Sequence, residues 1–263
     1  MDDYSSSTIS VRDCRVRLMR GGNGSPMLYL HGAGGAGIWL PFLSRLASKL
    51  DVIVPEHPGF GESDTPPWLD NIADLANFYL DFLDQLDLKG VHVVGHSLGG
   101  WIAAELAVRN STRLASLTLV AAGGIYVKGV EQVDTFLTSD EQRIRDLFYD
   151  QKLAEAIMPT ALRAEAEDSA LKNRMTTAKL IWQPRGYDPN LQKWLHRIKV
   201  PTLLIWGDHD RLFPQEYAFA YQNLIPGSRA VILQDCGHVP QVEQEDAFVA
   251  ELVSFIGAMR IAA

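Results

Sequence analysis

Ser97 stands between two glycines, each two positions away, in the sequence GHSLG over residues 95–99. An apolar run over residues 91–94 precedes this motif, and residues 97–109 follow with the pattern of a helix. A serine hydroxyl is a weak nucleophile until a base takes its proton, and a carbonyl carbon must be able to reach it. A sharp turn from strand to helix exposes the hydroxyl, because the glycines permit close backbone packing around a strained serine. The pattern favours a nucleophilic Ser97 over a glycine-rich turn in which the serine only caps the helix.

Two further polar residues, Asp210 and His238, each come shortly after an apolar run. The carboxyl ends of parallel strands share one edge of a sheet, so both side chains can converge with Ser97. We expect His238 to take the proton from Ser97, and Asp210 to fix the imidazole tautomer and stabilise the imidazolium. Asp208 lies in the same turn as Asp210 and is a competing acid. We expect Asp208 to cap that turn instead.

Acyl transfer also needs hydrogen-bond donors for the oxyanion that develops during attack. A glycine-rich loop, HGAGG over residues 31–35, follows another apolar run. We expect the backbone N–H groups of Ala33 and Leu98 to be these donors, and His31 to hold the loop. The loop fits neither of the two glycine-rich patterns of nucleotide-binding proteins, so we expect no nucleotide there.

Short apolar runs alternate with longer amphipathic stretches along most of the chain. We expect strands at 16–19, 27–30, 52–54, 91–94, 117–121, 202–206 and 230–233, and helices at 38–50, 71–88, 97–109 and 246–259. This alternation predicts a mostly parallel α/β sheet covered by helices on both faces.

The alternation stops between residues 124 and 197, a stretch rich in charged and helix-forming residues. We expect this stretch to form a helical cap, or lid, over a core made of residues 1–123 and 198–263. Apolar residues of the cap and the glycine-rich loop would line a substrate pocket. The expected substrate contacts are Gly32, Gly34, Tyr126, Trp182 and Val239.

The composition excludes several classes of protein. The 263 residues carry a net charge of −8, which argues against a binder of nucleic acid or of a membrane surface. The start of the chain lacks the basic and apolar regions of a secretory signal, and no apolar run approaches the roughly 18 residues that span a bilayer. We therefore expect a cytoplasmic protein in which Cys14 and Cys236 are free thiols. No Cys/His cluster has the spacing of a zinc site, so we expect no metal.

Five motifs together resemble the α/β-hydrolase fold family, in its group with a helical cap. They are HGAGG at 31–35, HPGFGESD at 57–64, GHSLGG at 95–100, WGDHDRLFP at 206–214 and CGHVPQVEQEDAF at 236–248. The resemblance covers almost the whole chain except the cap. It implies a doubly wound sheet of eight strands with helices on both faces, and an oxyanion hole formed by Ala33 and Leu98. The serine, histidine and aspartate of this family need no cofactor.

The resemblance also orders the possible activities. Haloalkane dehalogenases and soluble epoxide hydrolases of this fold carry an aspartate at the position of Ser97, so neither activity is expected. We expect a serine carboxylesterase that cleaves small, largely apolar esters through an acyl-enzyme. One alternative is a C–C bond hydrolase acting on ring-fission (meta-cleavage) products, although its nucleophile motif usually has asparagine in place of His96. Arg185 could then meet a substrate carboxylate, but a solvated surface arginine explains it more simply. A second alternative is a non-catalytic member of the family that binds small molecules. The sequence does not fix the oligomeric state, and a homodimer is possible.

Overall fold

The computed structural model describes residues 4–165 and 167–261. Its centre is a sheet of eight strands in the order β1-β2-β4-β3-β5-β6-β7-β8. The strands are β1 (Tyr4–Val11), β2 (Cys14–Gly21), β3 (Ser25–Leu30), β4 (Leu50–Pro55), β5 (Val91–His96), β6 (Leu114–Val120), β7 (Thr202–Gly207) and β8 (Arg229–Leu233). β1 and β2 are antiparallel to their neighbours, whereas β4, β3 and β5 to β8 run parallel. The expected eight-stranded, mostly parallel sheet is confirmed.

The central strands are buried along most of their length, as their mostly apolar sequences predict. Every residue of β5 and β7 is buried. The edge strand β1 was not expected, because its sequence YSSSTISV is mostly polar and mostly exposed. β1 pairs with β2 across a tight turn in which Arg12 adopts a φ of 53°. Backbone pairing with one neighbour, rather than apolar burial, therefore defines this strand.

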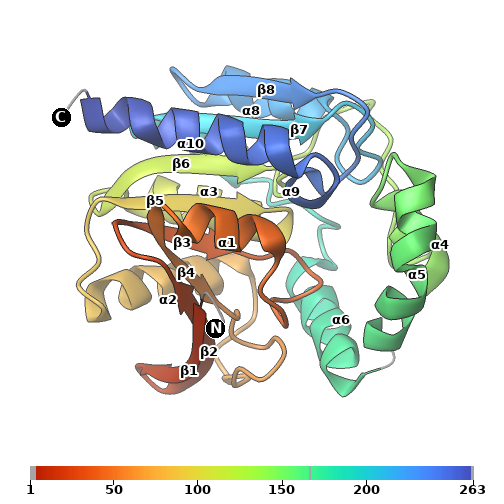
Figure 1. Ribbon diagram of the computed structural model, residues 1–263, viewed down its shortest axis with the longest axis horizontal. Coiled ribbons are helices and arrows are strands. Elements are labelled where there is room, and N and C mark those ends of the chain that lie inside the picture. Colours follow the sequence, from red (N-terminus) through yellow and green to blue (C-terminus); the bar gives the residue numbers. More distant parts are fainter. Residues whose placement is uncertain (1–3, 166, 262–263) are drawn as a thin grey trace.

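Helices cover both faces of the sheet (Figure 1). Helices α1 (Pro41–Ala47) and α10 (Glu245–Ile261) pack on one face, where the rings of Phe42 and Phe248 meet at 5.7 Å. Helices α2 (Ile72–Gln85), α3 (Leu98–Arg109) and α8 (Glu216–Leu224) pack on the other face. Each face thus has its own apolar core.

The helices expected at residues 38–50 and 71–88 are both shorter in the structure. The helix expected at residues 38–50 is limited to α1, because Leu50 already begins β4 and Ile38 lies in a loop with 69% of its surface exposed. Helix α2 begins one residue after Asn71, whose side chain accepts the N–H of Asp74 in a capping box. The asparagine therefore sets the start of α2.

The segment between β6 and β7 is helical. It contains α4 (Asp140–Asp146), α5 (Gln151–Glu165), α6 (Asp168–Ile181), α7 (Leu191–Trp194) and the short 3-10 helix η1 (Leu195–Arg197). Within the described part of this segment, the β pairing is a single bridge between Gly124 and Tyr187. Figure 1 shows α4, α5 and α6 grouped beside the sheet rather than on either of its faces. Among the described residues, no helix has both the length and the apolar character to cross a membrane.

Candidate active site

Ser97 occupies the turn between β5 and α3 with a φ of 55° and a ψ of −115°. A positive φ at a non-glycine residue costs about 1–3 kcal/mol, so the surroundings must hold this conformation. The Ser97 N–H donates to the Val120 carbonyl at 2.9 Å, and the Ser97 carbonyl accepts the N–H groups of Gly100 and Gly123. The backbone of Ser97 is therefore held at both of its polar groups.

The two glycines of the motif are required by close backbone contacts. A Cβ added at Gly95 would lie 2.3 Å from the Gly99 carbonyl oxygen, and one added at Gly99 would lie 2.0 Å from the Leu30 carbonyl oxygen. No other residue type fits at these distances. The strand-turn-helix geometry inferred from the spacing of the glycines is the one observed.

Ser97, His238 and Asp210 lie in one hydrogen-bonded row. His238 donates its Nδ1–H to Asp210 Oδ2 at 2.9 Å, because an ionised carboxylate can only accept. His238 Nε2 therefore carries a lone pair, and the Ser97 hydroxyl donates to it at 2.9 Å. The side chains of His238 and Asp210 are 2% and 0% exposed. Both ring nitrogens of His238 are therefore hydrogen-bonded within the row.

The two aspartates of the β7 loop have different partners. The second oxygen of Asp210 accepts the backbone N–H groups of Leu212 and Phe213 at 2.9 and 3.0 Å. Asp208 Oδ1 accepts the N–H of Cys236 at 3.1 Å. Asp210 therefore faces the histidine, whereas Asp208 holds the loop that carries it.

The expected oxyanion donors, Ala33 and Leu98, lie near Ser97 in two separate parts of the chain. Leu98 is the first residue of α3, and Ala33 belongs to the loop after β3. This loop packs against the serine, since a Cβ added at Gly32 would lie 3.3 Å from Ser97 Cβ. Among the hydrogen bonds between described residues, none uses the N–H of Ala33 or Leu98 as a donor. Both groups can therefore donate to a negative charge on a ligand.

Three buried histidines surround the site and are held neutral. His96 donates Nε2–H to the His238 carbonyl at 2.9 Å, and burial lowers the pKa of His96 to about 3. His31 donates Nδ1–H to the Gly32 carbonyl and accepts the N–H of His57 at Nε2. Burial lowers the pKa of His31 to about 4 and that of His57 well below its usual value. These histidines serve as fixed hydrogen-bonding groups that hold the loops around Ser97.

The loop that carries His238 is also bonded to the helical segment. The His238 N–H donates to the carbonyl of Leu147 at 2.8 Å. Glu243, the last residue of the short helix α9 (Pro240–Glu243), accepts the N–H of Gly237 at 2.5 Å and that of Asp150 at 2.6 Å. Sequence reasoning did not identify Glu243 or Leu147, because a lone carboxylate and a backbone carbonyl have no motif.

A cavity of about 340 Å³ opens beside Ser97 and His238. The loop after β3 forms one wall, including the expected contacts Gly32 and Gly34, and Val239 lies in the lining as well. The other lining residues are mostly apolar and include Tyr29, Ala36, Ile38, Leu40, Leu43, Val54, Phe136, Leu147, Ala170, Leu212 and Val242. A ligand in this cavity would therefore lie between Ser97 and the helical segment.

The cavity also has polar positions. Thr177 Oγ1 and Gln241 Oε1 are buried in its lining, and neither has a hydrogen-bond partner among the described residues. Arg143 and Arg174 line it too, and each bonds to Asp140 Oδ1, at 2.9 and 2.8 Å. A ligand could therefore form polar contacts at the side of the helical segment.

The structure does not bring the other two expected substrate contacts to this cavity. Tyr126 is 51% exposed, and its ring meets that of Tyr187. Trp182 is 53% exposed and lies under the guanidinium group of Arg185, 4.0 Å from the ring centre. Arg185 also forms an ion pair with Asp134 at 2.5 Å. Its guanidinium group therefore already has a carboxylate partner within the chain.

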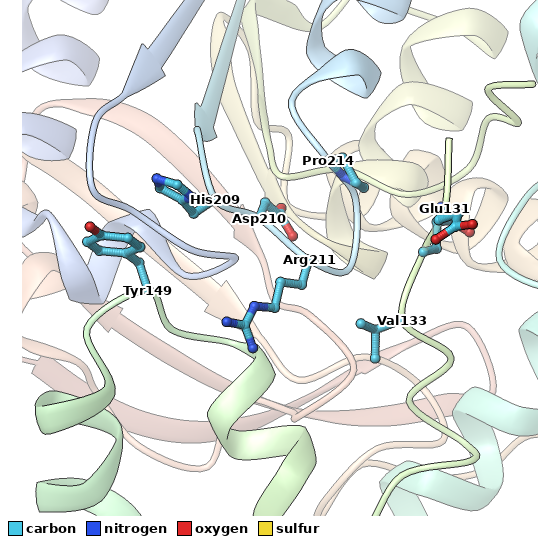
Figure 2. A pocket seen from close by; sticks show the side chains of 8 residues that line it. Glu131, Val133, Tyr149, His209, Asp210, Arg211 and Pro214 are labelled. Carbon is cyan, nitrogen blue, oxygen red and sulfur yellow. The ribbon is translucent and has the colours of Figure 1, made fainter. Parts of the chain in front are cut away.

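A second pocket, of about 510 Å³, lies near the β7 loop (Figure 2). Its lining includes Glu131, Val133, Tyr149, Arg211 and Asp210. Figure 2 shows Tyr149 beside His209, and their rings stack at 4.4 Å. Because the Asp210 side chain is fully buried, this pocket does not reach its carboxylate.

Both cysteines are free and buried. Burial raises the pKa of Cys14 to about 11 and raises that of Cys236 further. Neither thiol is therefore an activated nucleophile. Within the described residues, no group of three or more His, Cys, Asp and Glu side chains could hold a metal ion.

Comparison with known proteins gives matches along most of the chain. The sequence profile of the alpha/beta hydrolase fold family matches residues 25–245. Lipase 1 of Psychrobacter immobilis is 29% identical over 262 residues, covering 93% of this chain and 81% of that lipase. The 2-hydroxy-6-oxo-6-(2'-aminophenyl)hexa-2,4-dienoic acid hydrolase of Metapseudomonas resinovorans is 26% identical, covering 96% of this chain and 91% of that enzyme.

The structure of a serine hydrolase involved in carbazole degradation superposes with a TM-score of 0.83. The two chains are 23% identical, and the match covers 97% of this chain and 99% of the other. At this identity the likeness shows the fold alone. The sequence relatives include both lipases and C–C hydrolases.

Proposed function

The chain belongs to the α/β-hydrolase fold family, and we propose that it is a serine carboxylesterase that cleaves small, largely apolar esters. The observation that carries this proposal is the hydrogen-bonded row from Ser97 through His238 to Asp210 at the wall of the apolar cavity. The row supplies a nucleophile, a base and a buried counter-charge in the order that acyl transfer requires.

In the proposed acylation step, the Ser97 hydroxyl attacks the ester carbonyl while its proton moves to His238 Nε2. The carbonyl oxygen becomes an oxyanion and receives the N–H groups of Ala33 and Leu98. The buried Asp210 carboxylate stabilises the imidazolium that forms. The tetrahedral intermediate then collapses, the imidazolium gives its proton to the leaving alkoxide, and an alcohol departs.

In the proposed deacylation step, water takes the place of the alcohol. His238 Nε2 accepts a proton from this water as its oxygen attacks the acyl-enzyme carbonyl. The second oxyanion forms at the same two N–H groups. Collapse returns the proton to Ser97 and releases the carboxylic acid.

The proposed substrate range follows from the walls of the cavity. Apolar residues surround a ligand on most sides, which favours short acyl chains without charge. We propose that residues 124–197 act as a cap over a core of residues 1–123 and 198–263, because Phe136 and Leu147 of this segment line the cavity. Ala33 and Leu98 are the proposed oxyanion donors, and Gly32, Gly34 and Val239 the proposed substrate contacts.

The direct test is hydrolysis of p-nitrophenyl acetate, butyrate and octanoate by the wild type and by Ser97→Ala. We expect turnover by the wild type and a loss of at least about 10³-fold in the variant, with an unchanged melting temperature. The dependence on acyl length would report the depth of the cavity. If Ser97→Ala hydrolysed the esters as fast as the wild type, the proposed nucleophile would be wrong.

A second candidate function is hydrolysis of a C–C bond in a ring-fission product. Arg143 and Arg174 in the cavity lining favour it, because such substrates carry a carboxylate that could compete with Asp140 for these two arginines. Turnover of a vinylogous diketone acid with little ester hydrolysis would support this candidate. Stabilisation by such acids without any turnover would instead support the non-catalytic, ligand-binding alternative.

A further inference from the structure

Helix α6 is bonded to the two glycine-rich loops of the core through a row of polar side chains. Lys172 Nζ donates to the Gly61 carbonyl at 2.9 Å, and Thr176 Oγ1 donates to the Gly59 carbonyl at 2.6 Å. Between them on the helix, Asn173 reaches both loops. Its Oδ1 accepts the Gly61 N–H at 2.8 Å, and its Nδ2 donates to the Gly34 carbonyl at 3.0 Å.

The Gly34 carbonyl belongs to the turn that presents the Ala33 N–H. This turn is closed by a hydrogen bond from the Gly35 N–H to the Gly32 carbonyl at 3.1 Å. The peptide group between residues 34 and 35 is therefore held at both ends: its N–H by the turn, and its carbonyl by Asn173. Ala33 is a central residue of the same turn.

Without an external bond, this turn would be poorly fixed. Residues 32–37 include four glycines, which leave the backbone more conformations than any other residue type. A Cβ added at Gly34 would meet nothing within 4 Å, so local packing does not restrain that residue. A Cβ added at Gly35 would lie 2.6 Å from Asn173 Nδ2, so the asparagine lies directly against the turn.

We infer that Asn173 is a positioning residue that fixes the oxyanion-hole loop and so aims the Ala33 N–H at the reacting carbonyl. Asn173 is 7% exposed, and its amide serves both partners because it offers an acceptor to one and a donor to the other. This inference rests on the proposed function. It assigns to the helical segment a part in transition-state stabilisation in addition to enclosing the substrate.

The test compares Asn173→Asp and Asn173→Ala with a matched control, Thr176→Val. Asn173→Asp keeps the acceptor for Gly61 but turns a carboxylate oxygen toward the Gly34 carbonyl. Thr176 lies on the same helix face, is 6% exposed, and also donates to a glycine carbonyl, but that glycine is outside the oxyanion-hole loop. A loss that came only from loosened docking of α6 would appear in all three variants.

Two measurements separate positioning from substrate contact. In both Asn173 variants, we expect kcat to fall about 10- to 100-fold. The fall should be similar for p-nitrophenyl acetate, butyrate and octanoate. KM should change less than about threefold. Affinity for a trifluoromethyl ketone, which forms an oxyanion on Ser97, should fall in parallel. Thr176→Val should keep kcat within about threefold of the wild type. Unchanged kcat in both Asn173 variants, a loss confined to KM, or an equal loss in Thr176→Val would overturn the inference.

Labelling of Ser97 by a fluorophosphonate separates failure of the inference from failure of the proposed function. This probe needs a reactive serine and an oxyanion hole, but it needs no ester turnover. If the wild type is labelled without hydrolysing esters, the esterase proposal fails, and the labelling rates of the Asn173 variants still decide the inference. If Ser97 of the wild type is not labelled at all, both proposals fail.

Discussion

At the scale of single residues, the β7 loop shows how two aspartates two positions apart acquire different roles. Asp210 bonds to His238, whereas Asp208 bonds to the Cys236 N–H. We expect Asp210→Asn to lower kcat by about 10³- to 10⁴-fold, because an amide no longer fixes the productive tautomer or balances the imidazolium charge. Steady-state ester hydrolysis by the purified variant measures this effect.

Asp208→Asn is the matched control for that change. Its amide oxygen can still accept the Cys236 N–H, so we expect kcat within about fivefold of the wild type and a stability loss of about 1 kcal/mol. Full activity in Asp210→Asn combined with inactivity in Asp208→Asn would reverse the assignment of the acid.

Residues with a local signature could be predicted from the sequence, and residues without one could not. Ser97 and Asp210 follow the fully buried strands β5 and β7, and His238 follows the apolar but only partly buried strand β8. That context singles out all three residues as candidates without any contact information. Asn173 has partners 112 and 139 positions away, so its amide looks like any helical surface residue until the loops are packed. Trp182 is the opposite case, because its large aromatic ring suggested a substrate contact but lies under Arg185 and outside the cavity lining.

At the scale of elements, Glu243 of α9 joins the histidine loop to the start of α5 through the N–H groups of Gly237 and Asp150. We expect Glu243→Ala to lower the free energy of unfolding by about 2–3 kcal/mol, because two charge-assisted hydrogen bonds are lost. We also expect a lower kcat, since Gly237 precedes His238. Urea denaturation and ester hydrolysis on the same preparation measure both effects.

Glu245→Ala serves as the comparison for Glu243. Its carboxylate forms an ion pair with Arg45 at 3.2 Å, with side chains 28% and 43% exposed. Such surface pairs contribute less than about 1 kcal/mol. If both variants lost the same stability and neither lost activity, Glu243 would be an ordinary surface carboxylate.

Strands that are buried along their length could be predicted from the sequence. Elements whose position depends on backbone pairing or on packing against distant loops could not. The interior strands β5 and β7 are buried throughout and mostly apolar, so their sequences alone predict them. β1 was missed because an edge strand needs only backbone partners. The helical character of residues 124–197 was expected, but which of its side chains face Ser97 depends on the bonds of α6 and α4 to distant loops.

At the scale of the whole molecule, burial of histidines couples folding to pH. His31, His57 and His96 are buried, and burial lowers the pKa of each below that of an exposed histidine. Below about pH 6.5 the unfolded chain binds protons at these residues that the folded chain does not bind. Their contribution to stability is therefore complete above about pH 6.5 and is lost as the pH falls toward 4. The buried carboxyls of Glu56 and Glu105, whose pKa values are raised by burial, oppose this trend.

Replacing one of these histidines should therefore flatten the acid side of the stability curve. We expect His96→Asn, whose amide can still donate to the His238 carbonyl, to reduce the slope of unfolding free energy between pH 5.5 and 4.5. The reduction should be about 1.4 kcal/mol per pH unit, the value for one proton. Urea unfolding at half-unit steps of pH measures the slope. His209→Gln is the control for replacing any histidine, because this side chain is 53% exposed and keeps its contact with water in the folded protein. An unchanged slope in His96→Asn would mean that His96 takes up its proton without unfolding, and that burial does not keep it neutral in the folded protein.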